Sequence, residues 1–166
     1  MADSISDTGA RLLYLVQHGE AVPKSRDPER PLTATGWATV ERVAAWMVAA
    51  GLKVDQVRHS GKLRARQTAT IFNRALGPRE GLASYPGLGP NDDPQPVAEA
   101  LAACPCSVML VGHLPFLSRL ASLLLVGDPE RALVEFRNAG VVGLVRDEGR
   151  WTIACVVPAE VLPKAP

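Results

Sequence analysis

Residues 12–20 read LLYLVQHGE, an uninterrupted apolar run that ends in a glutamine, a histidine, a glycine and a glutamate. A continuous apolar run of this length, LLYLV, predicts a strand buried on both faces, as in a parallel sheet covered by helices. A second such run, VMLV at 108–111, is followed by Gly112 and His113. In sheets of this kind ligands bind beyond the carboxyl ends of the strands, so the residues after each run are the candidates for a site.

The segments between and after these two runs change to helical and loop patterns. Apolar residues from Gly36 onward follow helical spacing, and Thr33 and Gly51 stand where the two caps of that helix would lie. The remaining predicted elements are helices at 62–76, 96–103 and 113–126, strands at 54–58, 132–136, 140–145 and 151–157, and a Gly- and Pro-rich loop at 77–94. The alternation of strand and helix predicts an α/β fold, a three-layer α/β/α sandwich with a mostly parallel central sheet.

The length and composition predict one globular domain. A chain of 166 residues fits one domain, which we place at 11–158 with terminal tails at 1–10 and 159–166. A formal net charge of +1 argues against a nucleic-acid partner. The most apolar tract, 114–126, contains Pro115, Ser118 and Arg119 and is too short to span a bilayer, so no membrane association is expected.

The cysteines and the first residues favour a cytoplasmic protein. Cys104, Cys106 and Cys155 form an odd and sparse set, so we expect no disulfide framework, and we interpret Cys104 and Cys106 as packing residues. The opening MADSISDTGAR lacks the basic start and apolar stretch of a secretion signal.

All three histidines of the chain follow or end predicted strands: His18, His59 and His113. A metal site would be one use for them, but no HxH or CxxC spacing accompanies them, so no metal is expected. The alternative is covalent phosphoryl transfer, in which a neutral imidazole attacks phosphorus while cations hold the equatorial oxygens. Arg64, at the start of the helix after the second strand, is positioned to be such a cation.

Four segments, in order, resemble those of the histidine phosphatase superfamily, also called the phosphoglycerate mutase-like fold. They are His18-Gly19-Glu20-Ala21; Arg30-Pro31-Leu32-Thr33 with Gly36; Ser60 followed by Leu63-Arg64-Ala65 and Gln67-Thr68; and Gly112-His113-Leu114-Pro115. The short chain and the Arg-Pro-Leu-Thr segment look most like the SixA branch, whose members remove phosphate from phosphohistidine on signalling proteins. The resemblance covers about residues 11–157 and implies no cofactor.

The resemblance also implies roles for particular residues. His18 would be the nucleophile that becomes phosphorylated, Arg64 would clamp the phosphoryl oxygens, and His113 would help to bind the transferring group. The remaining residues expected at the phosphate are Gln17, Gly19, Arg30 and Ser60. Gly19 would let the backbone approach the phosphate closely.

Position 17 departs from the family signature, in which arginine precedes the nucleophile. Gln17 has amide donors but no charge, so a charge-assisted contact becomes a neutral one. The weaker stabilisation of the transition state is expected to lower the rate by about tenfold or more. Arg30 and Lys62 are candidates to compensate, and each also has an interpretation as a solvated cation. We expect His59 to point away from the phosphate.

The residue that protonates the leaving group is left open by the sequence. Glu20, Asp92 and Asp93 are the candidate acids. The alternative is that residues 91–93 only form a turn and cap the next helix.

Three functions follow from these residues. The first is a phosphatase acting on phosphohistidine of a signalling protein, favoured by the short 77–94 loop, which leaves the site open to a displayed side chain. The second is a small-molecule phosphomonoesterase of the same fold, which requires an acid. The third is a relative that binds phosphate or a phosphoprotein without catalysis, suggested by Gln17. The oligomeric state is not predicted.

Overall fold

The computed structural model describes residues 10–164, and its central sheet has six strands in the order β3-β2-β4-β1-β5-β6. The elements along the chain are β1 (Arg11–Gln17), α1 (Ala34–Ala49), β2 (Gln56–His59), α2 (Leu63–Leu76), β3 (Leu82–Ser84), α3 (Gln95–Ala103), β4 (Val108–Gly112), α4 (Phe116–Val126), β5 (Val141–Asp147), β6 (Arg150–Val157) and the 3₁₀ turn η2 (Ala159–Val161).

The sheet is parallel over four strands and antiparallel at one end. β1 and β2 both pair in parallel with the central strand β4, and β3 pairs in parallel with β2. β5 runs antiparallel to β1, and β6 antiparallel to β5. This arrangement confirms the predicted mostly parallel α/β sheet.

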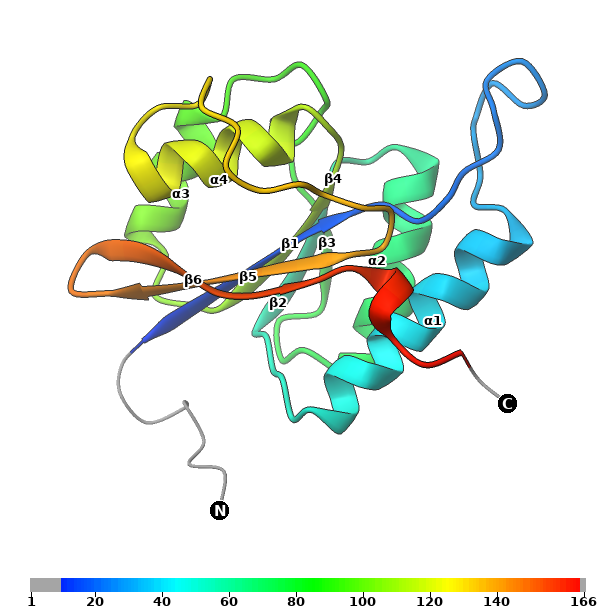
Figure 1. Cartoon of the computed structure of the whole chain (residues 1–166), viewed down its shortest axis with the longest axis horizontal. Coiled ribbons are helices and arrows are strands. Elements are labelled where there is room, and N and C mark those ends of the chain that lie inside the picture. The colour runs from blue at the N-terminus through cyan, green and yellow to red at the C-terminus, as the bar shows by residue number, and fades with distance from the viewer. Residues whose placement is uncertain (1–9, 165–166) are drawn as a thin grey trace.

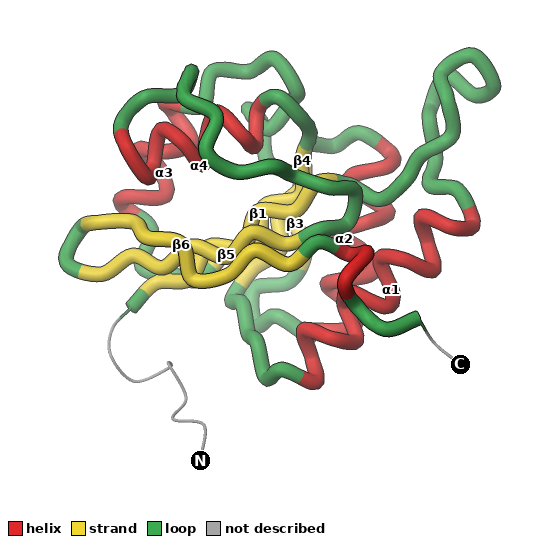
Figure 2. Tube along the Cα trace, in the orientation of Figure 1, coloured by secondary structure: helices red, strands yellow, loops and turns green. Residues whose placement is uncertain are grey.

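Helices cover both faces of this sheet, which gives the three layers (Figures 1 and 2). Along β1 the side chains alternate: Tyr14 and Val16 pack in the core under α1 and α2, whereas Leu13 and Leu15 pack in the core with α3 and α4. All four side chains are buried, as the unbroken apolar run predicted. Packing on both faces fixes the position of β1 in the sheet, and therefore also the position of the residues that follow it.

One strand prediction is wrong, and one predicted loop contains a short strand. Residues 132–136 pair with none of the six strands and form no strand. Conversely, the predicted loop at 77–94 contains β3, which pairs with β2 over three residues, from Val57 with Leu82 to His59 with Ser84. Pairing with a distant strand is a tertiary effect, which the local Gly and Pro pattern does not report.

Two expectations about the ends of elements also differ from the structure. Cys104 and Cys106 form a disulfide with a Cα–Cα distance of 5.4 Å, where only packing was expected. The odd, small number of cysteines argued against disulfides between distant segments. This bond instead closes a turn of three residues between α3 and β4. In the segment expected to be a tail, Ala159 and Leu162 are buried against the α1 side of the core.

Within residues 10–164, no helix is both long enough and apolar enough to cross a lipid bilayer.

Candidate active site

Three neighbouring parallel strands bring the three histidines to one edge of the sheet. His18 follows β1, His113 follows the adjacent β4, and His59 is the last residue of β2 on the other side of β4. The backbone N–H of His18 donates to the carbonyl of Gly112 at 3.1 Å, which extends the β1–β4 ladder past the strand end. The rings of His18 and His113 lie with their centroids 5.1 Å apart.

The hydrogen bonds of His18 define its protonation state. Its Nδ1 lies 2.7 Å from the carbonyl oxygen of Gly19, which can only accept, so Nδ1 carries the proton. Its Nε2 accepts a hydrogen bond from Nε of Arg64 at 3.2 Å. Burial, opposed by the Gly19 carbonyl and helped by the charges of Arg64 and Arg30, lowers the pKa of His18 to about 4. Near neutral pH the ring is therefore uncharged and has a nucleophilic lone pair on Nε2.

Arg64 is placed by the first turn of α2, which Thr68 connects to the His18 segment. The Thr68 hydroxyl donates to the carbonyl of Arg64 at 2.8 Å and accepts from the backbone N–H of Gly19 at 3.0 Å. Thr68 is fully buried, so both bonds are shielded from water. The sequence analysis assigned no role to this residue, although its position one helical turn after Arg64 places the two on the same face of α2.

The neighbouring Gln67 makes a second link of the same kind. Its side-chain oxygen accepts from the backbone N–H of Leu32 at 2.8 Å, which holds the segment after Arg30 against α2. This role was also missed from the sequence.

His113 is almost completely buried and has one side-chain partner. Its Nε2 lies 2.6 Å from Oγ of Ser60, whereas its Nδ1 is buried with no hydrogen-bond partner in the described chain. Burial, with the added charges of His18, Arg64, Lys62 and Arg30, lowers the pKa of His113 to about 3. His113 is therefore neutral in the free protein.

Arg30 enters the site in an unusual backbone conformation. Its φ is 53°, in the left-handed region that non-glycine residues seldom occupy, and such outliers gather at functional sites. Its Nε donates to the carbonyl of Val22 at 3.1 Å, which fixes the side chain. The charge of Arg30 makes a small contribution to lowering the pKa values of His18, Arg64 and His113.

Gln17 is the last residue of β1, opposite Gly112 in the β1–β4 register. Its carbonyl accepts from the backbone N–H of Ala139, and its side-chain Oε1 is buried with no hydrogen-bond partner among residues 10–164. A buried carbonyl oxygen without a hydrogen-bond donor costs the folded protein free energy.

Gly19 has a packing reason that the sequence analysis did not foresee. A Cβ added there would lie 2.7 Å from Cγ2 of Val40 and 3.2 Å from the carbonyl oxygen of Gly36. The glycine therefore allows the segment after β1 to lie close against α1, and its expected approach to phosphate remains a prediction.

The three candidate acids are engaged in local structure. Oε1 of Glu20 accepts from the Thr33 hydroxyl at 2.6 Å. Oδ1 of Asp93 accepts from the backbone N–H of Gln95, the first residue of α3, at 3.0 Å, as the turn interpretation expects, although the N-cap residue itself is Pro94, which makes no side-chain cap bond. Oδ2 of Asp92 accepts from the N–H of Gly89 at 2.7 Å, and Asp92 also lines a pocket.

His59 lies at the strand end without joining the pair of histidines. Its Nδ1 accepts from the backbone N–H of Gly61 at 3.0 Å, which supports the turn from β2 to α2. Burial, with a smaller contribution from Arg66, lowers the pKa of His59.

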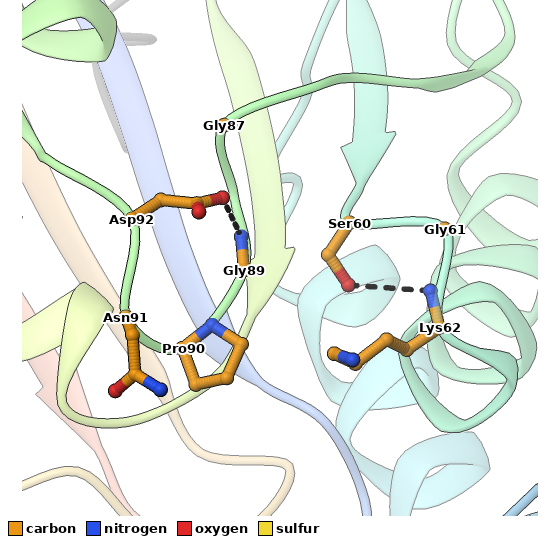
Figure 3. Close-up of a pocket in the computed structure, with 8 residues that line it drawn as sticks. All are labelled: Ser60, Gly61, Lys62, Gly87, Gly89, Pro90, Asn91 and Asp92. Atoms are coloured by element: carbon orange, nitrogen blue, oxygen red, sulfur yellow. Dashed lines mark hydrogen bonds between the residues drawn. The ribbon is translucent and has the colours of Figure 1, made fainter.

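An open pocket of about 540 Å³ adjoins the histidine pair. Residues 60–62 form one wall and residues 87–92 the other (Figure 3). Ser60 belongs to both places, because its hydroxyl contacts His113 and also lines the pocket.

The donor set does not resemble a metal site. Among residues 10–164, no group of three or more His, Cys, Asp or Glu side chains is placed to hold a metal ion. The groups that surround His18 and His113 are guanidinium and hydroxyl donors, which suit an oxyanion.

Comparison with known proteins agrees with this chemistry. Residues 13–88 match the histidine phosphatase superfamily (branch 1). The chain is 34% identical over 140 residues to an uncharacterized protein of Picosynechococcus sp., covering 80% of this chain and 83% of that protein. It is 28% identical over 141 residues to the phosphohistidine phosphatase SixA of Escherichia coli, covering 82% of this chain and 86% of that protein.

A solved structure extends the similarity to three dimensions. The protein histidine phosphatase SixA complexed with tungstate superposes with a TM-score of 0.78 at 25% identity, covering 89% of this chain and 97% of that one.

Proposed function

The chain belongs to the histidine phosphatase superfamily, and from this membership we propose that it removes phosphate from phosphohistidine of a signalling protein through a phosphorylated His18. The superfamily and the SixA relatives point to a phosphatase. The phosphohistidine substrate, the protein partner and the residue roles below are the proposal.

The observation that carries the proposal is the orientation of the His18 ring. The Gly19 carbonyl keeps the proton on Nδ1, and Nε2 presents its lone pair beside Arg64. As Nε2 bonds to phosphorus, positive charge develops on the ring, and the Nδ1–H bond to the carbonyl stabilises that charge. The arrangement that fixes the nucleophilic tautomer thus also supports the phosphorylated form.

Two guanidinium groups supply the charge for the transferring phosphoryl group. In this proposal the N–H groups of Arg64, one of which now bonds Nε2 of His18, turn to the phosphoryl oxygens as substrate enters. Arg30 supplies the second cation, held in place by its bond to Val22. His113, neutral and bonded to Ser60, keeps a second ring nitrogen for a phosphoryl oxygen.

The reaction then proceeds in two displacements. In the first, Nε2 of His18 forms a bond to phosphorus as the P–N bond of the substrate breaks, and the leaving imidazole takes up a proton from solvent or a neighbouring group. In the second, water attacks the phosphorus of phospho-His18, loses a proton, and releases inorganic phosphate with free His18. The similar SixA structure holds tungstate, an oxyanion, which supports an oxyanion site here.

The test is phosphate release from a phosphorylated phosphotransfer domain, with radiolabel retained on the enzyme. We expect an acid-labile, alkali-stable label on the wild type and neither label nor release with His18→Ala. Release by the wild type that equals the release by His18→Ala would refute the proposal.

A phosphomonoesterase is the second candidate, because Asp92 brings a carboxylate to the pocket beside the site. An alkoxide leaving group needs an acid more than a protonated imidazole does. If Asp92 is that acid, Asp92→Asn lowers turnover of phosphate monoesters and spares phosphohistidine.

A further inference from the structure

We propose that the pocket beside the histidine pair binds the peptide segment that carries the phosphohistidine, and that Lys62 recognises a carboxylate next to the phosphorylated residue. This inference rests on the proposed phosphohistidine phosphatase function and adds a sequence preference to it.

The pocket lies where the rest of a substrate would extend. Ser60 hydrogen bonds to His113 through an oxygen that also faces the pocket, so the phosphoryl site and the pocket share one side chain. In this proposal the group attached to the phosphorus extends past Ser60 into the pocket. The pocket that Ser60 lines is bounded on its other side by Gly87 and residues 89–92.

The lining of the pocket suits a peptide main chain. Glycines at 61, 87 and 89 leave backbone exposed, and Pro90 is the only apolar side chain besides them. Pockets for small molecules are mostly lined by hydrophobic and aromatic side chains, which this pocket lacks. Because the glycines carry no side chain, the main chain of a peptide can lie close to the walls of the pocket, where the N–H groups of Gly61 and Gly89 are bonded to His59 and Asp92.

The charges of the pocket select the neighbouring side chain. Lys62 extends from the Ser60 wall into the gap, toward Pro90 (Figure 3). None of the ion pairs found within residues 10–164 involves Lys62, so its ammonium is available for a carboxylate of a partner. Asp92, on the opposite wall, is the one acidic side chain of the lining, and its Oδ2 accepts from the Gly89 N–H at 2.7 Å.

Lys62 is therefore the charge that distinguishes an acidic from a basic residue next to the phosphohistidine. Because the Asp92 carboxylate is turned toward its own loop in Figure 3 whereas Lys62 reaches into the gap, an acidic neighbour is favoured over a basic one. The charge of Lys62 also helps to lower the pKa of His113, in keeping with a position close to the phosphoryl site.

The experiment measures a preference ratio. Three phosphohistidine peptides that differ only in the residue next to the phosphohistidine, Glu, Gln or Lys, are compared by kcat/KM, together with N-phosphoimidazole. The wild type should prefer the Glu peptide to the Lys peptide by about 5-fold, the size expected of an exposed charge pair. Lys62→Gln should abolish this ratio and Lys62→Glu should reverse it.

Matched controls separate recognition from net charge. Lys53 is exposed and precedes β2, at the opposite end of that strand from Lys62, so Lys53→Glu makes the same charge change and should keep the wild-type ratio. The preference should also shrink when the ionic strength is raised, because salt screens exposed charges.

The failures of the two proposals are distinguishable. If the wild type releases phosphate from neither N-phosphoimidazole nor any peptide, the proposed function is wrong. If it hydrolyses them but the ratio is near one, or if Lys62→Glu lowers all peptides equally, the peptide-recognition inference is overturned and the function stands.

Discussion

The phosphoryl site and the loop beside the pocket, residues 87–94, are held by different kinds of hydrogen bond. Hydrogen bonds at the site join residues far apart in sequence: 46 positions for His18 and Arg64, 49 for Gly19 and Thr68, and 53 for Ser60 and His113. Those of the loop join residues two or three positions apart, Asp93 with Gln95 and Asp92 with Gly89, and they are exposed.

This difference determines which part of the molecule can vary. The site residues are positioned by β1, β4 and α2 together, so changing one of them disturbs a network built across the fold. The loop carries its own short-range bonds, so its side chains can change the choice of substrate at little cost to the fold.

The largest effect should come from the nucleophile. His18→Asn removes the attacking nitrogen but keeps a polar side chain of similar reach, and we expect phosphate release to fall by about 10³-fold or more. His59→Asn is the matched control, since His59 is also buried at a strand end but bonds only the Gly61 turn. Equal losses in the two variants would mean that the effect of His18→Asn comes from changing a buried histidine and not from removing a nucleophile.

Arg64 should give the next largest loss. Arg64→Lys keeps the charge but loses the planar fork, and we expect kcat/KM to fall by about 30-fold, the value of a lost bidentate charge-assisted contact. Arg66→Lys, exposed and two residues further along α2, should leave kcat/KM unchanged. An equal response of the two arginines would show that Arg64 does not contact the phosphoryl group.

The histidine pair, His18 and His113, should make stability depend on pH. Their folded pKa values, about 4 for His18 and about 3 for His113, lie below the unfolded value of 6.5, mainly because burial disfavours the charged ring. The unfolded chain therefore binds protons first. Their contribution to stability is complete above pH 6.5 and declines as the pH falls toward these folded values, by about 1 kcal/mol or more per histidine.

Urea unfolding between pH 4 and 7 measures this decline. The His18→Asn variant should lose part of the pH dependence, and its unfolding free energy should approach the wild-type value most closely at the acid end. A wild-type pH dependence that is identical in the variant would mean that His18 does not carry the effect.

Gln17 should give a gain instead of a loss. Gln17→Arg adds a cation beside His18, where a buried amide oxygen now has no partner, and we expect kcat/KM to rise by about tenfold. Combining it with Arg30→Ala asks whether the two guanidinium groups act on the same phosphoryl oxygens, because a shared role makes the effects non-additive. An unchanged or lower rate would mean that the site is adapted to glutamine.

The sequence predicted the parts of this molecule that local pattern determines. Unbroken apolar runs predicted β1 and β4, and the polar residues after them predicted a site at that edge, where His18 and His113 indeed lie together. Helical spacing and the Thr33 cap predicted α1, and the Thr33 hydroxyl accepts from the Gly36 N–H at 2.9 Å.

What the sequence could not predict depends on contacts between distant segments. β3 forms by pairing with β2, whereas residues 132–136 pair with no strand of the sheet. The role of Thr68 depends on where Gly19 lies in space, and the tautomer of His18 depends on its contact with the Gly19 carbonyl. Periodicity contains no information about any of these contacts.

The smallest effect is expected at Asp93, where the sequence allowed both an acid and a cap. Its carboxylate accepts from the N–H of Gln95 and lies on the loop, not among the described lining of the pocket. Asp93→Ala should therefore leave kcat unchanged on phosphohistidine and phosphate monoesters alike. Asp93→Asn should leave kcat unchanged as well, and its amide oxygen can still accept that bond. A fall in kcat with both variants, greatest on monoesters, would instead identify Asp93 as the acid and remove the functional separation between the loop and the site.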